Sequence, residues 1–226
     1  MGAGYVGLVT SACFADLGHR VACADIDARK IAQLKKGRVP IYEPGLDELV
    51  RRNLKTHRLA FTSSVRDAVR SAEIVFIAVG TPARPDGEAD LSAVKAVARE
   101  IGRSLNGPKI VVNKSTVPVG MGDLVASIIR EERGGRYRCA VVSNPEFLRE
   151  GSAVHDFMHP DRIVIGAGDA KASETVARLF RPLNAPIMVT DVRSAEMIKY
   201  ASNAFLACKI SFINEIAALC DRVGAD

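Results

Sequence analysis

The sequence predicts an α/β protein in which a doubly wound, mainly parallel sheet is followed by one long α-helix. Short runs rich in β-branched residues alternate along the chain with longer segments of helical periodicity. Several short runs, such as residues 74–79, are apolar throughout. This composition is typical of parallel strands, because both faces of a parallel sheet are buried. Alternating strands and helices also predict right-handed crossover connections.

The individual elements follow from these patterns. Strands are expected at residues 20–24, 74–79, 109–112, 139–142, 162–165 and 187–189. Helices are expected at residues 5–17, 28–36, 46–54, 91–103, 121–131 and 170–180. The glycine motif described below should follow a central strand. Because the sequence begins at Met1, directly before that motif, we expect the first strand of the sheet to be missing.

The final segment differs in character from the rest of the chain. Residues 191–223 contain neither glycine nor proline, and their apolar residues recur at helical spacing. Asp191 and Ser194 are both candidates for the N-cap of this helix. We therefore divide the chain into a domain at residues 1–190 and a long central helix at residues 191–226, which leads to middle and C-terminal domains outside the sequence. The apolar stripe of so long a helix predicts a homodimer built around it.

Composition narrows the class of protein. Of the 226 residues, 48% are hydrophobic and 25% are charged, a balance typical of globular proteins. We find no secretory signal and no apolar run that would span a membrane, so we expect a cytoplasmic protein without a membrane partner. The net charge is +5, and the basic residues are scattered along the chain with no aromatic-rich strand among them, which argues against a nucleic-acid partner. The five cysteines have no metal-ligand spacing, so we expect structural thiols and no metal.

A GxGxxG motif stands at the start of the chain, where Gly2, Gly4 and Gly7 enclose Ala3, Tyr5 and Val6. In a Rossmann-type fold the first glycine permits a tight turn and the second lets the backbone approach a pyrophosphate. The third lets the helix pack closely on the strand. Backbone N–H groups at the start of the next helix would hold the phosphate charge. A lone motif is weak, and a chance glycine-rich turn is the alternative.

An acidic residue follows the motif at a suitable distance. The predicted strand at residues 20–24 ends at Asp25, which is placed to receive the 2′-hydroxyl of an adenosine ribose. A carboxylate there favours NAD, because it would repel the 2′-phosphate of NADP. The sequence therefore predicts NAD as the cofactor, with a surface aspartate as the alternative.

Three more segments of loop composition follow predicted strands, at residues 79–82, 114–118 and 144–151. Open α/β sheets bind ligands at the carboxyl ends of their strands. Each segment alone could be an ordinary turn, since glycine, proline, asparagine and serine are turn residues. Three of them at successive strand ends favour a binding site.

With these segments the sequence resembles the UDP-glucose/GDP-mannose dehydrogenase family over essentially its whole length. The resemblance rests on an ordered series of motifs at residues 2–7, 40–46, 79–82, 86–90, 115–118, 144–151, 156–162 and 196–205. It implies two hydride transfers to NAD that oxidise C6 of a nucleotide sugar to the acid through a cysteine thioester. Residues 156–162 and 199–205 are most similar to the branch that uses UDP-glucose. GDP-mannose and UDP-N-acetyl sugars are the alternative substrates.

The resemblance also implies roles for particular residues. Glu146 would activate water for thioester hydrolysis, and Thr116 would position that water or Glu146. Lys199 would act as a base or stabilise the oxyanion at C6, and Asn203 would help to hold that oxygen. NAD would be contacted by Gly2, Gly4, Tyr5, Val6, Gly7, Asp25, Lys30, Val79, Gly80, Thr81, Pro82, Ser115, Thr116, Val117 and Glu150, and the substrate by Glu146, Phe147, Leu148, Arg149, Glu150, Lys199 and Asn203.

The residues themselves agree with these roles in part. Lys199 and Asn203 are four residues apart and share one face of the predicted helix, among mostly apolar neighbours. A desolvated lysine suits a base that works near neutrality, although a lysine with its ammonium in water is the alternative. Glu146 follows Asn-Pro at a strand end, where a carboxylate in a partly dry pocket can act as a base. A surface loop acid is the alternative there.

One part of the family pattern is missing from the sequence. The family's nucleophilic cysteine lies in a glycine-rich segment beyond the long helix, and this sequence has no such segment. Cys208 and Cys220 fall on the apolar helix and lack the electropositive setting of a thiolate nucleophile. We therefore expect the chain alone to bind NAD without completing the oxidation. A non-catalytic NAD-binding or oligomerisation module is the competing interpretation.

Overall fold

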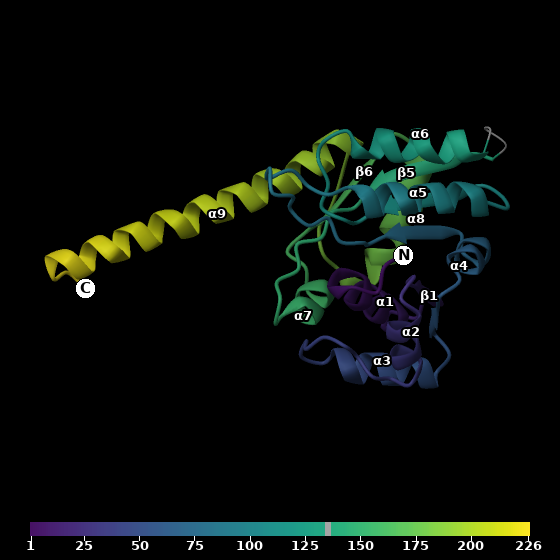
Figure 1. Cartoon of the computed structure of the whole chain (residues 1–226), viewed down its shortest axis with the longest axis horizontal. Helices are drawn as coiled ribbons and strands as arrows, with labels where there is room; N and C mark the ends of the chain where they lie inside the picture. The colour runs from purple at the N-terminus through teal and green to yellow at the C-terminus, as the bar shows by residue number, and fades with distance from the viewer. Residues whose placement is uncertain (134–136) are drawn as a thin grey trace.

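The computed structural model describes residues 1–133 and 137–226 and has the expected α/β architecture (Figure 1). Its strands are β1 (Val21–Ala24), β2 (Leu59–Thr62), β3 (Ile74–Ile77), β4 (Lys109–Asn113), β5 (Cys139–Ser143), β6 (Ile163–Ala167) and β7 (Ile187–Thr190). Its helices are α1 (Tyr5–Asp16), α2 (Ala28–Lys35), α3 (Leu46–Lys55), α4 (Val65–Ser71), α5 (Ser92–Ser104), α6 (Met121–Arg133), α7 (Ala153–Met158), α8 (Ala170–Phe180), the 3-10 turn η1 (Arg181–Leu183) and α9 (Val192–Val223). Every predicted element is present, and its ends differ from the prediction by no more than two residues.

The strands form two neighbouring sheets. β1 pairs with β2 in parallel, and the larger sheet has the order β3-β4-β5-β6-β7. Neighbours in the larger sheet are parallel except for β5 and β6, which are antiparallel. The prediction of a mainly parallel sheet is therefore confirmed. Because β3, β4 and β5 run in the same direction, the loops that follow them meet at one edge of the sheet.

Met1 and Gly2 lie between the two sheets. The Met1 amino group donates to Phe76 O at 2.8 Å, and the N–H of Ala78 donates to Met1 O at 2.8 Å. On the other side, the N–H of Gly2 donates to Ala24 O at 2.8 Å. These bonds join the carboxyl end of β3 to that of β1. Met1 also lines a cavity of about 350 Å³, together with residues of β1, β3 and α1.

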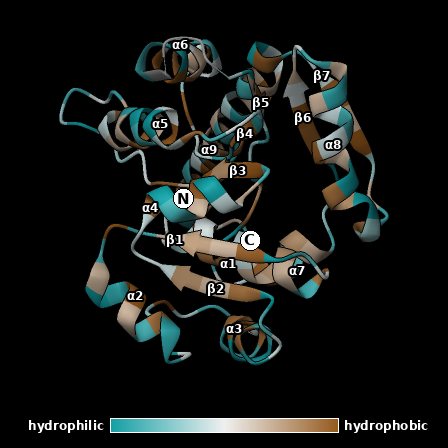
Figure 2. Cartoon of the chain, turned by 90° about the vertical axis from the view of Figure 1, so that its right-hand side faces the viewer, coloured by the Kyte–Doolittle hydropathy of each residue, from teal (hydrophilic) through white to brown (hydrophobic). Residues whose placement is uncertain are grey.

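Helices cover both faces of the larger sheet, and the buried residues form two apolar clusters (Figure 2). Because side chains alternate along a strand, Val111 of β4 joins the cluster beneath α5 and α6, whereas Val112 joins the cluster beneath α1, α7 and α8. In the second cluster the rings of Phe157 and Phe180 meet Phe14 edge to face, with centroids 5.2 Å and 5.1 Å away. Aromatic packing therefore fixes α7 and α8 against α1.

Short elements are what the sequence analysis missed. β2, α4, α7 and η1 were not predicted, and each spans seven residues or fewer. Two turns of helix or four residues of strand show too few periodic positions to reveal a pattern. The omission of α7 matters, because this helix lines the candidate site described below.

The first turns of α9 pack on the body of the protein, and the rest of the helix extends away from it (Figure 1). Asp191 is the N-cap that the helix uses, and its carboxylate accepts the N–H of Ser194 at 2.9 Å. Buried residues of α9 are confined to Ala195, Glu196 and Lys199. Exposed apolar side chains follow along the extended part, at Phe205, Leu206, Ile210, Phe212, Ile213, Ile216, Leu219 and Val223.

By length and composition alone, α9 could cross a membrane. The sequence has no uninterrupted apolar run in this segment, because Lys209 and Glu215 lie among the apolar residues. A charged side chain at the centre of a bilayer is costly, and a single helix of this kind is weak support for a membrane protein. A contiguous exposed apolar face is also typical of a surface that binds another protein.

Candidate cofactor and active site

The glycine motif forms a tight turn that leads into α1. Gly2 has a φ of +95°, and a Cβ on it would lie 2.5 Å from Ala78 O. A Cβ on Gly7 would overlap Gly2 O, so neither position accepts another residue without movement. The N-cap Gly4 has no side chain to satisfy the first N–H groups of α1. The turn therefore presents helix N–H donors in the way that phosphate sites require.

Asp25 lies beside this turn at the end of β1. Its Oδ2 accepts the N–H of Ala3 at 2.7 Å and the ammonium of Lys30 at 3.3 Å, and its Oδ1 accepts the N–H of Asp27 at 2.9 Å. Burial acts to raise the pKa of Asp25, but these hydrogen bonds outweigh it and hold the pKa below 3.8. The carboxylate is therefore ionised and fixed against the glycine turn. Lys30, which was expected to contact NAD, is bound to Asp25.

The loops after β3 and β4 are bound to each other. The hydroxyl of Ser115 donates to Val79 O at 2.7 Å, and the hydroxyl of Thr81 donates to Thr116 O at 2.8 Å. Ser115 is buried, so its hydrogen bond is shielded from water. The structure thus places residues 79–82 beside residues 115–117, as expected for two loops that share one ligand.

A second connection joins the glycine turn to the loop after β5. The Tyr5 hydroxyl donates to Glu43, whose side chain is buried. The N–H of Gly151 donates to Glu43 Oε2 at 2.9 Å and lies 3.0 Å from the Tyr5 oxygen. Burial raises the pKa of Tyr5 to about 12, and the bond to Glu43 acts in the same direction. In the sequence Glu43 stands out only as part of the motif at residues 40–46, and its partners could not be predicted.

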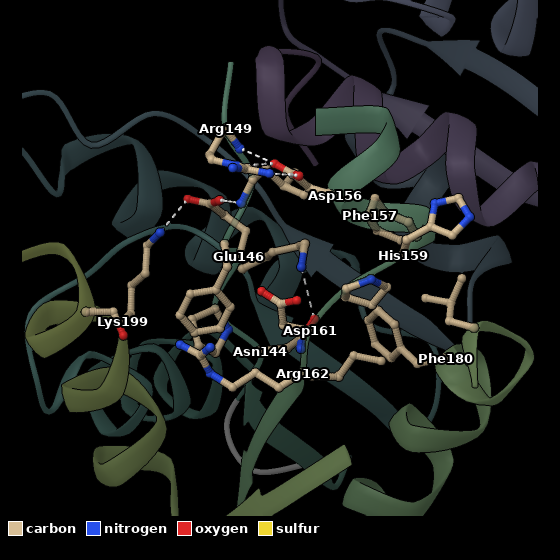
Figure 3. Close-up of a pocket in the computed structure, with 18 of the residues that line it drawn as sticks. Asn144, Glu146, Arg149, Asp156, Phe157, His159, Asp161, Arg162, Phe180 and Lys199 are labelled. Carbon is tan, nitrogen blue, oxygen red and sulfur yellow. Dashed lines mark hydrogen bonds and ion pairs between the residues drawn. The ribbon is translucent and has the colours of Figure 1, made fainter. Parts of the chain in front are cut away.

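Glu146 and Lys199 form a buried ion pair (Figure 3). Lys199 Nζ lies 3.0 Å from Glu146 Oε1, and only 9% and 12% of the two side chains are exposed. The other carboxylate oxygen, Oε2, accepts the N–H of Leu148 at 2.6 Å. Sequence reasoning selected both residues separately, but their pairing depends on how α9 packs against the loop after β5. The alternatives of a snorkelling lysine and a surface loop acid do not hold in this structure.

This ion pair lies in a cavity of about 420 Å³ that is also lined by Phe147, Leu148, Arg149 and Asn203. The Lys199 ammonium is 5.3 Å from the centroid of the Phe147 ring, and the Arg162 guanidinium is 4.6 Å from it. Cations over an aromatic face are attracted to it. All the residues expected to contact substrate therefore surround one cavity, except Glu150, which is exposed outside its lining.

Other side chains of the cavity are held by α7. Arg149 binds Asp156 through its guanidinium, with Nη2 2.6 Å from Oδ1, and through its backbone N–H at 2.9 Å. The bond from Arg149 is the largest cause that lowers the pKa of Asp156 below 3.8. His155 and His159 stack with ring centroids 4.7 Å apart. Their spacing of four residues on a helix explains the contact.

Sequence reasoning missed Lys114 as a member of this cavity. Its ammonium donates to Asn144 Oδ1 at 3.2 Å, and Asn144 Nδ2 donates to Val164 O at 2.8 Å. Lys114 is 4% exposed and Asn144 is 1% exposed. Burial lowers the pKa of Lys114 to about 8, although the Glu146 carboxylate acts in the opposite direction. The sequence feature that could have identified Lys114 is its position directly after a predicted buried strand.

Two predicted residues make no direct bond to the ion pair within the described part of the chain. Asn203 lines the cavity on the exposed side of α9. Thr116 lies outside the cavity lining, and its carbonyl is bound by Thr81.

The cysteines lie away from the cavity. Burial raises the pKa of Cys13 to about 12 and that of Cys139 to about 11, and it also raises the pKa of Cys23. Cys208 and Cys220 lie on α9. Among residues 1–133 and 137–226, no group of three His, Cys, Asp or Glu side chains could hold a metal ion.

Sequence comparisons point to one group of enzymes. Residues 1–184 match the NAD-binding domain of the UDP-glucose/GDP-mannose dehydrogenase family, and residues 193–226 match the central domain of that family. The chain is 58% identical over its full length to the UDP-glucose 6-dehydrogenase TuaD of Bacillus subtilis and covers 49% of that protein. It is 57% identical to the UDP-glucose 6-dehydrogenase of Rhizobium meliloti, with 100% of the chain and 53% of the relative covered.

Solved structures agree with these matches. A UDP-glucose dehydrogenase from the archaeon Pyrobaculum islandicum superposes with a TM-score of 0.96 at 50% identity. A GDP-mannose dehydrogenase from Pseudomonas aeruginosa superposes with a TM-score of 0.96 at 38% identity. Each comparison covers 100% of this chain and 53% of the other chain. This chain therefore spans about half the length of the relatives it matches.

Proposed function

Because the chain belongs to the UDP-glucose/GDP-mannose dehydrogenase family, we propose that it forms the cofactor-binding half of an enzyme that oxidises C6 of UDP-glucose to a carboxylate. The observation that carries the proposal is the buried pair of Glu146 and Lys199, 3.0 Å apart, at the sheet edge where the glycine turn also lies. Alcohol oxidation needs an acid–base group beside a hydride acceptor.

The residues at this edge fit an adenine dinucleotide. The N–H groups of the glycine turn would hold the pyrophosphate, and the ionised Asp25 would accept a ribose hydroxyl. The nicotinamide half would extend toward residues 79–82, Ser115–Val117 and Glu150, as the family resemblance implies. Bound there, NAD supplies the acceptor for a hydride from C6.

Lys199 and Glu146 would handle the charge on the C6 oxygen and the proton transfers of the reaction. When the C6 alcohol becomes an aldehyde, its hydroxyl proton must leave, and the Lys199 ammonium would stabilise the oxygen as that proton passes toward Glu146. At the later thioester stage the Glu146 carboxylate would take a proton from the attacking water. The family resemblance places the thioester cysteine in a glycine-rich segment beyond the long helix, and the cavity lining contains no cysteine among the described residues.

The neighbouring residues would orient the sugar nucleotide. Asn203 would hold the C6 oxygen together with Lys199, and Thr116 would position the water. Phe147 and Leu148 would run along the substrate. Because Asp156 holds the guanidinium of Arg149, Arg149 would contribute mainly through its backbone.

We propose UDP-glucose rather than GDP-mannose as the substrate, because the three UDP-glucose enzymes described above are 50–58% identical to the chain, against 38% for the GDP-mannose enzyme. UDP-N-acetyl sugars remain the other alternative. We further propose a cytoplasmic homodimer, in which the exposed apolar residues of α9 pack against a second copy.

The test separates an enzyme from a non-catalytic NAD-binding module. NADH absorbance would be followed with UDP-glucose for this chain and for a version extended to the length of its relatives. We expect NAD binding by both and NAD reduction only by the extended version. Glu146→Gln in the extended version should abolish turnover while NAD binding is retained. NAD binding without turnover in either version would favour the module, and absence of NAD binding in both would refute the proposal.

A further inference from the structure

A buried carboxylate joins the start of α6 to the first turns of α9. Glu196 is 2% exposed, and its two carboxylate oxygens accept the N–H groups of Gly120 and Gly122, each at 2.7 Å. The first N–H groups of a helix have no partner within the helix and attract negative charge. At the start of α6 the Glu196 carboxylate therefore binds these N–H groups. At the start of α1 no side chain among the described residues caps the helix, so its N–H groups can bind a ligand.

The two helices approach closely at this junction. A Cβ on Gly122 would overlap the Val192 side chain and would lie 3.3 Å from Glu196 Oε1. At the exposed rim of the same junction, Arg193 binds Asp123 at 2.8 Å. Burial raises the pKa of Glu196, which indicates that holding this carboxylate inside the protein costs stability.

The junction connects two parts of the candidate site. Residues 115–117, expected to contact the nicotinamide half of NAD, lie directly before α6. Lys199 follows Glu196 by three residues, so both side chains leave the same face of α9. The same helix therefore holds the loop before α6 through Glu196 and the loop after β5 through the bond from Lys199 to Glu146.

We propose that Glu196 is a positioning residue that sets residues 115–117 at a fixed distance from Lys199 and thereby places the nicotinamide half of the cofactor. The inference rests on the proposed function, because it assumes that NAD lies against residues 115–117. Glu196 does not touch the cofactor in this scheme and acts only through the start of α6.

Two variants disturb the junction in different ways. Glu196→Gln keeps the size of the side chain but replaces one acceptor oxygen with a donor, so one of the two N–H groups loses its partner. Gly122→Ala keeps the charge but forces α6 away from Val192. Arg193→Ala is the matched control, because it removes the exposed ion pair at the rim and leaves the buried carboxylate unchanged. Each protein is first required to unfold cooperatively, and Glu196→Asp replaces Glu196→Gln if the latter does not fold.

The first measurement is hydrogen exchange of the backbone amides in the full chain. We expect the backbone amides of positions 120, 122 and 115–117 to exchange about tenfold faster in both junction variants. Arg193→Ala should change them by less than about twofold. Unchanged exchange at residues 115–117 in both junction variants would overturn the proposal, whether or not the chain binds NAD.

The second measurement is calorimetry with NAD and with ADP, which lacks the nicotinamide half. In both junction variants the Kd for NAD should rise about tenfold, whereas that for ADP should stay within about twofold. A global loss of structure would weaken the binding of both ligands alike, so equal losses of affinity for NAD and ADP would also overturn the proposal. If the unmodified chain binds neither ligand, the proposed function fails, and the exchange measurement still decides the role of Glu196.

Discussion

Replacing Lys114 with methionine tests how much stability the protein gives up to hold a cation beneath the candidate site. Lys114 is buried at the end of β4, and its ammonium donates a hydrogen bond to Asn144 Oδ1. Methionine has a similar length but carries no charge. The variant therefore removes a buried cation while it preserves most of the packing against Phe180, whose ring centroid lies 5.9 Å from the ammonium.

The structure gives the size of the effect. Burial lowers the pKa of Lys114 to about 8 from an ordinary 10.5, and a difference of this size corresponds to about 3 kcal/mol. Losing the bond leaves Asn144 Oδ1 without its donor, which costs about 1 to 3 kcal/mol. At pH 7 we therefore expect the free energy of unfolding of Lys114→Met to equal that of the unmodified chain or to exceed it by up to about 2 kcal/mol. Replacement of buried charges by apolar residues often has this outcome.

The dependence on pH is the sharper test. Between pH 8 and 10.5 the unfolded chain keeps the Lys114 proton that the folded protein has released. More protons are then bound to the unfolded state, so the free energy of unfolding rises with pH in this window. The unmodified chain should accordingly gain up to about 3 kcal/mol relative to Lys114→Met from pH 7 to pH 10.5. Only the difference between the proteins is used, because the buried thiols titrate in both.

The assay is urea unfolding of both proteins at pH 7, 8, 9 and 10, followed by circular dichroism. Lys109→Met is the matched control, since Lys109 is buried at the other end of β4, away from the cavity, and donates to Ala72 O. Burial also lowers the pKa of Lys109. Because Lys109 is 9% exposed, against 4% for Lys114, its pH-dependent difference should be smaller. A difference between the unmodified chain and Lys114→Met that stays flat from pH 7 to pH 10 would refute the reasoning.

Three other predictions follow from the same contacts. Asp25→Asn should weaken NAD binding about tenfold in calorimetry. It should also reduce the preference for NAD over NADP, because the carboxylate repels a 2′-phosphate. An unchanged preference for NAD would contradict the assignment of Asp25 to the adenosine ribose. Arg149→Ala should lower the thermal midpoint more at pH 7 than at pH 3, since the depressed pKa of Asp156 stabilises the folded state above pH 3.8 and this contribution declines as the pH falls toward the folded value. Equal losses at both pH values would exclude this linkage. Replacing Phe205 and Phe212, which are 71% and 66% exposed, with serine should shift sedimentation from dimer to monomer, and an unchanged profile would remove α9 from the interface.

Much of this arrangement could be predicted from the sequence because it depends on local pattern. Apolar runs between helical segments predicted the strands, and the glycine motif with Asp25 predicted the cofactor turn. Both signals are short-range, since they depend on backbone conformation and side-chain periodicity within about 25 residues. Loop residues at successive strand ends predicted where the site lies, because parallel strands bring their carboxyl ends to one edge.

The missing parts depend on contacts between distant segments. Glu43 meets Gly151 across 108 positions of the sequence, and Glu196 meets Gly122 across 74. No periodicity reports which acidic residue becomes buried, because a carboxylate is buried only where donors from another element meet it. Lys30 is a similar case, since the family resemblance implied a contact with NAD but not the ion pair that Lys30 forms with Asp25 in the folded chain.

The charges of the candidate site are connected in a way that makes its geometry depend on the whole fold. Glu146 from the loop after β5 pairs with Lys199 from α9, and Lys114 from the end of β4 binds Asn144 beside that loop. Each of these charges would be costly if its partner moved away, because a buried charge without a partner is strongly disfavoured. Glu196 and Lys199 leave the same face of α9. A shift of this helix would therefore disturb the Lys199–Glu146 pair and the bonds from Gly120 and Gly122 to Glu196 together. The extended part of α9 carries exposed apolar residues, so the second copy proposed to pack against it would act on both loops through one helix.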